Sequence, residues 1–355
     1  MISVPRWLPA QTARERNVPW LAEVQQTRPP VANPAANDKP LAPLLVDEGG
    51  REIRTVAEWE LRRQRLLRTW SDFLGLEKLP RPQQIELTVL AEDRDAGVLR
   101  RRIRYEVEPG WVSEAYWLEP QNLDARAPAA VALHSTVEHS IRQPAGLAPD
   151  KEQAFALQLA QRGFVCIAPR NYLWPTNDHI KANEESSRFL AAHPGCKGMA
   201  KMLLDAQIAV DLLARSPHVD SKRIACVGHS LGAKEVLYLA AFDPRIVAAV
   251  SSEGGIGKFF SNWDAPWYLG STIKSDDFVL DHHELLAATA PRPFLLIGGD
   301  SADGDRSWPY VARAMQVYQL YNKTPPLGLY NHKQGHAVPP ECGERILEWI
   351  TTYTA

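Results

Sequence analysis

Short apolar runs separated by helical patterns dominate the chain after Pro128. The runs are continuous, which is typical of strands covered on both faces in a parallel sheet. The segments between them repeat apolar residues at helical spacing, so the order is strand then helix throughout. The predicted strands are 129–133, 164–168, 223–227, 246–250, 293–297 and 327–330. The predicted helices are 153–161, 199–214, 233–241, 307–320 and 341–351.

A different pattern occupies residues 84–119. Runs such as 85–89 and 101–107 alternate apolar and polar residues, as half-exposed antiparallel strands do. Together the two patterns predict an α/β fold: a mostly parallel central sheet with antiparallel N-terminal strands and helices on both faces.

The N-terminal region is expected to lie outside this sheet. Residues 1–50 are rich in Pro and Ala, and the close spacing of the prolines favours an extended arm. Residues 55–74 place Trp and Leu at helical spacing among arginines, which predicts an amphipathic helix packed on the main body. We therefore divide the chain into an arm and helix over 1–80 and a catalytic domain over 81–355.

Charge and composition narrow the partners. Forty basic and 42 acidic side chains give a net charge of -2, which offers no footprint for nucleic acid or an anionic membrane. No signal peptide or membrane span is recognisable, so a cytoplasmic location is expected for the sequence as written. The four scattered cysteines indicate neither a zinc site nor a disulfide framework. We expect no cofactor or metal, a small neutral or modestly polar substrate, and leave the oligomeric state open.

The strongest chemical motif is Gly228-His229-Ser230-Leu231-Gly232. It follows an apolar strand and runs into a good helix former, which is the strand–turn–helix setting of a nucleophile elbow. Such a turn pushes the serine Oγ outward, and glycines are needed because side chains would collide with the neighbouring strand and helix. Ser230 is the predicted nucleophile.

A serine needs an imidazole to accept its proton. His336 follows the last predicted strand and precedes the last helix, where this architecture places its base. His332 is the alternative, while His229 is expected to pack or bond locally. His282 and His283 are expected to begin a helix on the solvated surface.

The imidazole needs an acidic partner, and two loops compete for that role. Asp303 follows the strand 293–297 and would complete the chain order Ser, Asp, His, so it is our first choice. Glu253 follows the strand 246–250 and reaches the same sheet edge. It is the alternative acid or an additional carboxylate that steadies His336.

Two further sets of residues complete the predicted site. The backbone amide of Leu231, with that of Ser135 or Thr136 after the first buried strand, is expected to form the oxyanion hole. Aromatic side chains in two inserts at the carboxyl ends of strands are expected to wall a substrate pocket or form a small core. They are Trp174, Trp263, Trp267 and Tyr268.

With these motifs the chain from about residue 80 resembles the α/β-hydrolase superfamily, in its acetyl xylan esterase and dienelactone-hydrolase-like branch. The stretches 134–136, 143–146, 264–270 and 303–308 are similar to that branch. Dienelactone hydrolases use a cysteine nucleophile, so Ser230 does not imply lactone opening. The chain also has a weaker likeness to glucuronoyl esterases, whose acid is often a glutamate placed like Glu253. Those enzymes carry Arg after the nucleophile, where this chain has Leu231.

These features favour a serine esterase that acts on an acetyl or carbohydrate ester through an acyl-enzyme and a Ser-His-acid triad. Three alternatives are weighed against it. They are a glucuronoyl-esterase-like enzyme that uses Glu253, a peptidase like the prolyl oligopeptidases, and a hydrolase-like binding protein without activity. The region before Pro128 is too short for the propeller of the peptidases, and the motif residues are all kept, which argues against loss of catalysis.

Overall fold

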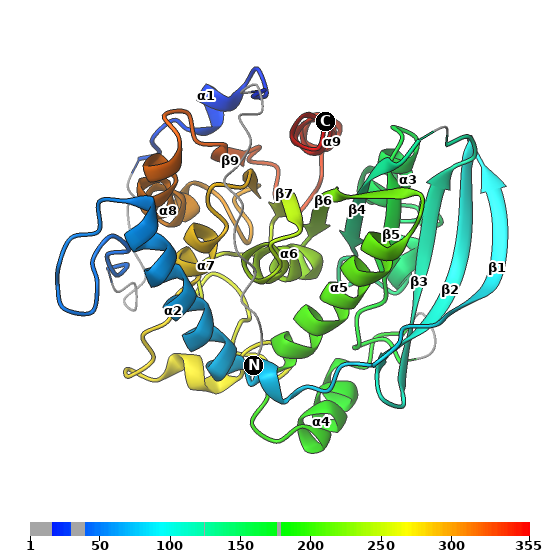
Figure 1. Ribbon diagram of the computed structural model, residues 1–355, viewed down its shortest axis with the longest axis horizontal. Coiled ribbons are helices and arrows are strands. Elements are labelled where there is room, and N and C mark those ends of the chain that lie inside the picture. The colour runs from blue at the N-terminus through cyan, green and yellow to red at the C-terminus, as the bar shows by residue number, and fades with distance from the viewer. Residues whose placement is uncertain (1–15, 30–39, 124, 176–178) are drawn as a thin grey trace.

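A mixed sheet forms the centre of the protein (Figure 1). The computed structural model describes residues 16–29, 40–123, 125–175 and 179–355, and within them nine strands pair in the order β1-β2-β3-β5-β4-β6-β7-β8-β9. The strands are β1 (Leu87–Asp95), β2 (Val98–Glu108), β3 (Trp111–Pro120), β4 (Ala127–Leu133), β5 (Val165–Pro169), β6 (Val219–His229), β7 (Ile246–Ser252), β8 (Phe294–Gly298) and β9 (Leu327–Asn331).

The direction of pairing changes within this sheet. From β1 to β3, and between β3 and β5, neighbouring strands are antiparallel. From β5 through β4 to β9, all pairs are parallel. The predicted antiparallel start and parallel body are therefore confirmed. Because the strands from β4 to β9 run the same way, the loops that follow them gather at one edge of the sheet.

Helices cover both faces of the parallel part. They are α1 (Leu21–Val24), α2 (Val56–Leu74), α3 (Phe155–Ala160), α4 (Ala182–Ala192), α5 (Gly198–Arg215), α6 (Leu231–Phe242), α7 (His282–Ala288), α8 (Trp308–Tyr321) and α9 (Pro340–Tyr353). Alternate residues of β4 enter two separate cores, with Val131 on the face covered by α2, α5, α6, α7 and α8, and Ala132 on the face covered by α1, α3 and α9. Covering both faces explains why the strands read as continuous apolar runs.

The helix α2 has the amphipathic character that the sequence predicts. A capping box at Thr55 and Glu58 begins it, and Gly75 ends it in the left-handed conformation with φ 70°. Its apolar stripe contacts α5, α7 and α8. The buried Trp70 donates a hydrogen bond from Nε1 to Glu284 on α7 (2.9 Å), so the helix is joined to the main body by polar as well as apolar contacts.

The described part of the N-terminal arm is not simply extended, which corrects the expectation for residues 1–50. Residues 21–24 form the one-turn helix α1, which packs on β9. Gln25 donates to the carbonyl of Leu327 (3.0 Å) and Arg28 to that of Leu329 (3.1 Å). These contacts cover the outer edge of the sheet, where backbone groups would otherwise lack partners. Residues 1–15 and 30–39 lie outside the described part.

The described residues hold neither a candidate membrane-spanning helix nor a candidate metal cluster. No helix among them has both the length and the apolar character needed to cross a bilayer. Nor do three or more His, Cys, Asp or Glu side chains gather in that part of the chain as metal ligands would. The four cysteines are buried and not joined in disulfides.

Candidate active site

Ser230 lies at the tight turn between β6 and α6. Its backbone angles are φ 57° and ψ −115°, a conformation that residues other than glycine rarely adopt. The flanking glycines make the turn possible. A Cβ atom on Gly228 would lie 2.4 Å from the backbone of Gly232, and one on Gly232 would lie 2.3 Å from the carbonyl oxygen of Leu133. The strand–turn–helix setting and the steric reason for both glycines are as the sequence predicts.

Three side chains from different loops form a hydrogen-bonded row. Ser230 Oγ lies 2.9 Å from Nε2 of His336, and Nδ1 of the same ring lies 3.0 Å from Oε2 of Glu253. An ionised carboxylate can only accept, so Nδ1 carries the ring proton and Nε2 accepts from the serine hydroxyl. The loops that carry these residues follow β6, β7 and β9 at the same sheet edge.

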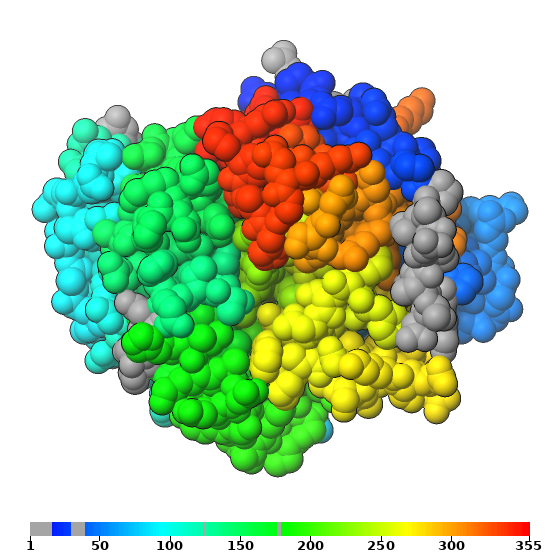
Figure 2. Space-filling view, turned by 180° about the vertical axis from the view of Figure 1, so that it is seen from behind, coloured from blue at the N-terminus to red at the C-terminus, as the bar shows by residue number. Residues whose placement is uncertain are grey.

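The row is open to solvent at one end and closed at the other. Ser230 is partly exposed, and the side chain of His336 is 45% exposed, whereas that of Glu253 is fully buried. Figure 2 shows the face opposite to that of Figure 1, where a furrow separates the green segments from the red and yellow ones. The red segment includes the loop after β9, and the yellow segment follows β7. A substrate can therefore reach the serine and the imidazole but not the acid.

The buried Glu253 is held by its neighbours as well as by His336. It accepts hydrogen bonds from the amides of Gly299 and Ala302 (2.7 Å for the latter), which belong to the loop after β8. Burial alone would raise the pKa of Glu253, but the hydrogen bonds from His336 and these amides outweigh it and hold the pKa below its usual value. The carboxylate is thus ionised at neutral pH. Its backbone φ of 55° is a second departure from common geometry.

Asp303, our first choice of acid, is placed elsewhere. Its two oxygens accept from the amides of Gly255 (2.6 Å) and Ile256 (2.9 Å), and Oδ1 also accepts from the hydroxyl of Ser307 (2.6 Å). The partner of His336 is instead the alternative, Glu253. The expectation of a contact between Asp303 and His336 is wrong because the carboxylate points back into the neighbouring loop, where it is fully buried.

The candidate oxyanion amides differ in availability. Leu231 is the first residue of α6, so its N–H has no acceptor one turn earlier in the helix. The amide of Ser135 already donates to Oε1 of Gln143 (2.9 Å), which removes it from the predicted set. Thr136 is exposed at the same loop. Of the two amides expected from the loop after β4, that of Thr136 remains.

The histidine of the elbow and the pair at the start of α7 are all buried. His229 is buried and hydrogen-bonded through Nδ1 to the hydroxyl of Ser252 (3.0 Å), as expected of a local role. Burial lowers the pKa of His229 to about 4, so the ring is neutral. His282 and His283 begin α7 as predicted, but both are only 1% exposed, which corrects the surface expectation. Their Nδ1 and Nε2 atoms bond the carbonyls of Ile256 and Ala42, respectively, so backbone acceptors allow the rings to be buried.

The four aromatic residues of the predicted substrate pocket fall into two groups. Trp174 lines a cavity beside β5, although little of its own surface is exposed. Trp263 and Tyr268 are buried, and their rings lie against the ammonium of Lys234 at 4.2 and 5.3 Å. Trp267 is half-buried. The three aromatic residues of the insert after β7 therefore pack in or against the main core on one face of the sheet, and neither wall a substrate pocket nor form a small core of their own.

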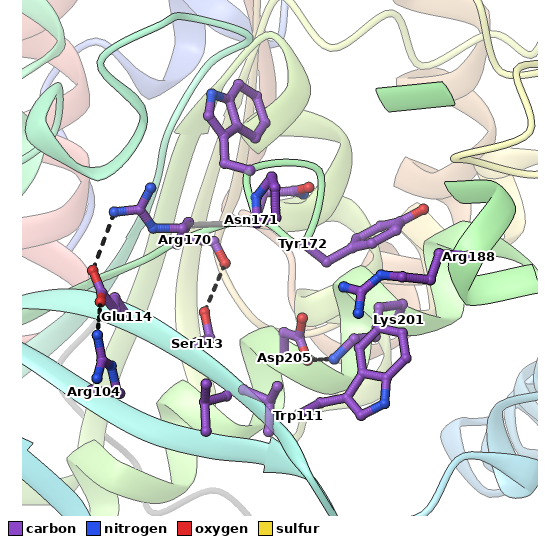
Figure 3. A pocket seen from close by; sticks show the side chains of 14 residues that line it. Arg104, Trp111, Ser113, Glu114, Arg170, Asn171, Tyr172, Arg188, Lys201 and Asp205 are labelled. Atoms are coloured by element: carbon purple, nitrogen blue, oxygen red, sulfur yellow. Dashed lines mark hydrogen bonds and ion pairs between the residues drawn. The ribbon is translucent and has the colours of Figure 1, made fainter. Parts of the chain in front are cut away.

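The cavity beside β5 has a volume of about 120 Å³, and both polar and apolar side chains line it (Figure 3). Arg104, Glu114 and Arg170 lie on one side of it, and Tyr172 and Arg188 lie on the other. It sits at the sheet edge that carries Ser230, because Arg170 directly follows β5 and its amide donates to the carbonyl of Glu114 (2.8 Å) at the start of antiparallel β3. Between β5 and β6 stands only β4.

Sequence reasoning missed Lys234, which is 4% exposed on α6 one turn after Ser230. It also missed Asn171, whose backbone N–H donates to Nε2 of His134 (3.1 Å) beside the candidate oxyanion loop. A signal for Lys234 was present. The helix from 231 to 242 is apolar apart from Lys234 and Glu235, and a charge inside such a helix faces the protein interior.

Known proteins of similar sequence or structure share this architecture. Residues 114–266 match the dienelactone hydrolase family. Among solved structures, a glucuronoyl esterase from Solibacter usitatus covers 88% of this chain and 97% of its own, with 16% identity and a TM-score of 0.71. A protein from Bacteroides fragilis described as an acetyl xylan esterase covers 78% of this chain and 76% of its own, with 17% identity and a TM-score of 0.64. At these identities the likenesses concern the fold.

Two curated proteins are more similar in sequence over shorter stretches. A carbohydrate esterase from an unknown prokaryotic organism is 29% identical over 105 residues, which are 25% of this chain and 24% of that protein. Dipeptidyl-peptidase 5 of Porphyromonas gingivalis is 28% identical over 156 residues, which are 40% of this chain and 21% of that protein. This chain thus spans about a quarter or less of the length of either relative.

Proposed function

We propose that this chain, an α/β-hydrolase whose residues 114–266 match the dienelactone hydrolase family, is a serine esterase that cleaves esters of carbohydrates. The observation that carries the proposal is the row from Ser230 through His336 to Glu253, with contacts of 2.9 and 3.0 Å. A nucleophile, a base within hydrogen-bond reach and an ionised orienting acid are the groups that acyl transfer through a serine requires.

The reaction follows from the positions of these groups. Ser230 Oγ attacks the ester carbonyl as its proton passes to Nε2 of His336, and Glu253 stabilises the resulting imidazolium. The amides of Leu231 and Thr136 are proposed to receive the negative charge on the carbonyl oxygen. His336 then gives the proton to the departing alcohol, which leaves an acyl-enzyme. A water molecule, deprotonated by the same ring, releases the acid.

The substrate class is supported by two observations that point in slightly different directions. Both structural relatives are described as esterases, one of glucuronoyl and one of acetyl xylan type. Glu253 occupies the position that resembles the glucuronoyl esterases, whereas Leu231 stands where those enzymes carry Arg. We infer that acetyl esters of sugars are the better substrates and uronate esters the second candidate. The cavity beside β5, which has both charged and aromatic side chains in its wall, is proposed to receive the sugar portion of either ester.

Labelling tests the proposal. A fluorophosphonate reagent is expected to modify the wild type at one site and to leave Ser230→Ala unmodified, because only an activated serine attacks phosphorus readily. Hydrolysis of p-nitrophenyl acetate should disappear in the same variant. Equal labelling of both proteins, or no labelling of the wild type, would contradict the esterase assignment.

A substrate panel separates the esterase from a peptidase, which the likeness to dipeptidyl-peptidase 5 keeps as the second candidate function. The panel contains acetylated xylo-oligosaccharides, a uronate methyl ester and a dipeptide p-nitroanilide, compared by kcat/KM. We expect the acetylated sugar to give the highest value and the anilide no measurable turnover. Faster cleavage of the anilide than of every ester would assign a peptidase instead.

A further inference from the structure

The strongest unexplained feature next to the proposed site is a buried lysine. Lys234 is 4% exposed, and its ammonium donates to the carbonyl oxygen of Gly254 and to the hydroxyl of Ser261 (2.8 Å). The rings of Trp263 and Tyr268 cover it. Removing an ammonium from water is costly, so its retention in this place calls for a reason in what it holds.

Lys234 does not face a space that could hold a substrate. The cavity beside it measures about 10 Å³ and is walled by side chains such as Leu237, Ile256 and Leu296. That is at most the space of one water molecule. Burial lowers the pKa of Lys234 to about 7, while the negative charge of Asp303 acts in the opposite direction. Its described partners belong to the segment that follows Glu253.

Two buried side chains bind the backbone of residues 254–256 from opposite sides. Lys234 holds the carbonyl of Gly254, the residue directly after Glu253. Asp303 holds the next two amides, those of Gly255 and Ile256. An ammonium donor on the carbonyl side and a carboxylate acceptor on the amide side thus hold three successive residues.

Glu253, the residue before this segment, has a strained backbone conformation. Glu253 has φ 55°, and such a conformation persists only where the surroundings over-determine it. If the peptide after Glu253 rotated, its carboxylate would move away from Nδ1 of His336. The amides of Gly299 and Ala302 bind the carboxylate oxygens of Glu253. The backbone of Glu253 must therefore be held in place for the same carboxylate to reach His336 as well.

We propose that Lys234 and Asp303 form a buried clamp on residues 254–256 that positions Glu253 against His336. Lys234 is then a positioning residue of the reaction: it lies one helical turn from the nucleophile, and its ammonium bonds to Gly254 and Ser261 and not to Ser230. The inference rests on the proposed esterase function. Ser230 and Lys234 lie at the first turn of α6, and the Lys234 side chain holds the residue after Glu253. Lys234 thereby links the position of the nucleophile to that of the acid.

Substitution of Lys234 by Met tests the clamp. Met keeps most of the buried volume and removes the charge and the donor, so the protein is expected to fold. Misplacement of Glu253 should lower kcat on p-nitrophenyl acetate about 10- to 100-fold and leave KM within about twofold. Lys234→Gln, which retains a shorter donor, should recover part of the loss. If Lys234 only filled space in the core, Lys234→Met would instead lower Tm and leave kcat unchanged.

Lys258→Met is the matched control. Lys258 lies on the insert after β7, where its ammonium donates to the carbonyl of Leu280 (3.3 Å) and pairs with Asp281 (3.7 Å) and not with residues 254–256. This variant also loses a lysine that bonds to a backbone carbonyl, but it should leave kcat near that of the wild type. A fall in kcat equal to that of Lys234→Met would overturn the proposal, because it would mean that any disturbance of the insert acts alike.

A double-mutant cycle with Glu253→Gln decides whether Lys234 acts through the acid. If it does, Lys234→Met should cost little more once Glu253 is replaced, so the double variant should have nearly the kcat of Glu253→Gln alone. Multiplication of the two losses would refute the clamp. An active wild type with no effect of Lys234→Met would refute the clamp alone, whereas an inactive wild type would count against the proposed function.

Discussion

Two buried carboxylates on neighbouring loops, Glu253 after β7 and Asp303 after β8, invite direct comparison. Each loop holds the acid of the other. Glu253 accepts from the amides of Gly299 and Ala302, and Asp303 accepts from those of Gly255 and Ile256. What separates the two acids is a third partner, which is the His336 ring for Glu253 and the Ser307 hydroxyl for Asp303.

The difference teaches that burial and hydrogen bonding to backbone do not by themselves make a carboxylate part of a site. They set its charge. The pKa of Glu253 is lowered because hydrogen bonds to His336 and two amides overcome the effect of burial, whereas the pKa of Asp303 is raised because burial prevails over the bonds that it accepts. The acid next to the imidazole is the one stabilised as an anion.

The largest expected effect is that of Glu253→Gln on turnover. An amide in place of the carboxylate no longer stabilises the imidazolium and favours the wrong tautomer of His336, so kcat should fall by about 10³- to 10⁴-fold. The measurement is steady-state hydrolysis of p-nitrophenyl acetate.

Glu235→Gln is a matched control for this prediction. Glu235 is also buried, it accepts from Asn171 rather than from a histidine, and burial raises its pKa to about 8. Its neutral form resembles glutamine, so the control should retain a kcat close to that of the wild type. If Glu253→Gln behaved like this control, the acid would have to be sought elsewhere.

Asp303→Asn should act first on stability. Asn keeps one acceptor oxygen, so one of the two N–H groups of Gly255 and Ile256 faces the new NH2 group and loses its acceptor, and we expect the free energy of unfolding to fall by about 2 to 3 kcal/mol. The loss of kcat should be about tenfold, well below that of Glu253→Gln, because the clamp is weakened but the imidazole keeps its acid. Urea unfolding and kcat measured on the same preparation test this. The reverse ranking of the two acids would make Asp303 the partner of His336.

The two acids should also change stability with pH in opposite directions. Because the pKa of Glu253 is lowered by folding, its contribution is present above the pKa of the unfolded chain and is lost as the pH falls through the folded value. Because the pKa of Asp303 is raised, its ionisation disfavours the fold, and stability attributable to it increases on acidification. Differences in Tm between the wild type and each single variant, followed from pH 7 towards pH 4, should have opposite slopes. Equal slopes would mean that the two environments are electrostatically alike.

The smallest expected effect concerns Ser307. Ser307→Ala removes one hydrogen bond from Asp303 and leaves the two amides in place, so the free energy of unfolding should fall by about 1 kcal/mol. The kcat value should stay within about twofold of the wild type. A loss of activity comparable to that of Asp303→Asn would indicate that the clamp depends on the hydroxyl more than on the carboxylate.

Much of the architecture could be predicted because it depends on local patterns. The six parallel strands read as continuous apolar runs since both of their faces are covered, and the α/β-hydrolase fold expected from them is confirmed. The helix α4 was missed, although Phe189 and Glu185 are buried on it, because its sequence has few apolar residues to mark a stripe. The short helix α1 was missed for a similar reason, since one turn carries too little pattern.

Within the site, the same division holds. Ser230 and its glycines are encoded in five consecutive residues, so the turn that presents the serine is a local property of the sequence. The choice between Glu253 and Asp303 is not local, because both follow strands that end at the same edge. Which carboxylate contacts His336 depends on how the loops after β7 and β8 pack together. That packing is set by the amides of Gly299 and Gly255 and the hydroxyl of Ser307, each of which binds one of the two acids.

The sequence by itself determined the order of strands and helices, the exposed serine and the edge of the sheet where its partners gather. Only the tertiary structure decided which acid is bound to the imidazole, that the amide of Ser135 is already occupied by Gln143, and that Lys234 grips the segment beyond Glu253. The physical reason is the range of the interactions. Periodicity and turn chemistry act over a few residues, whereas a hydrogen bond is fixed by atoms that folding alone brings within about 3 Å.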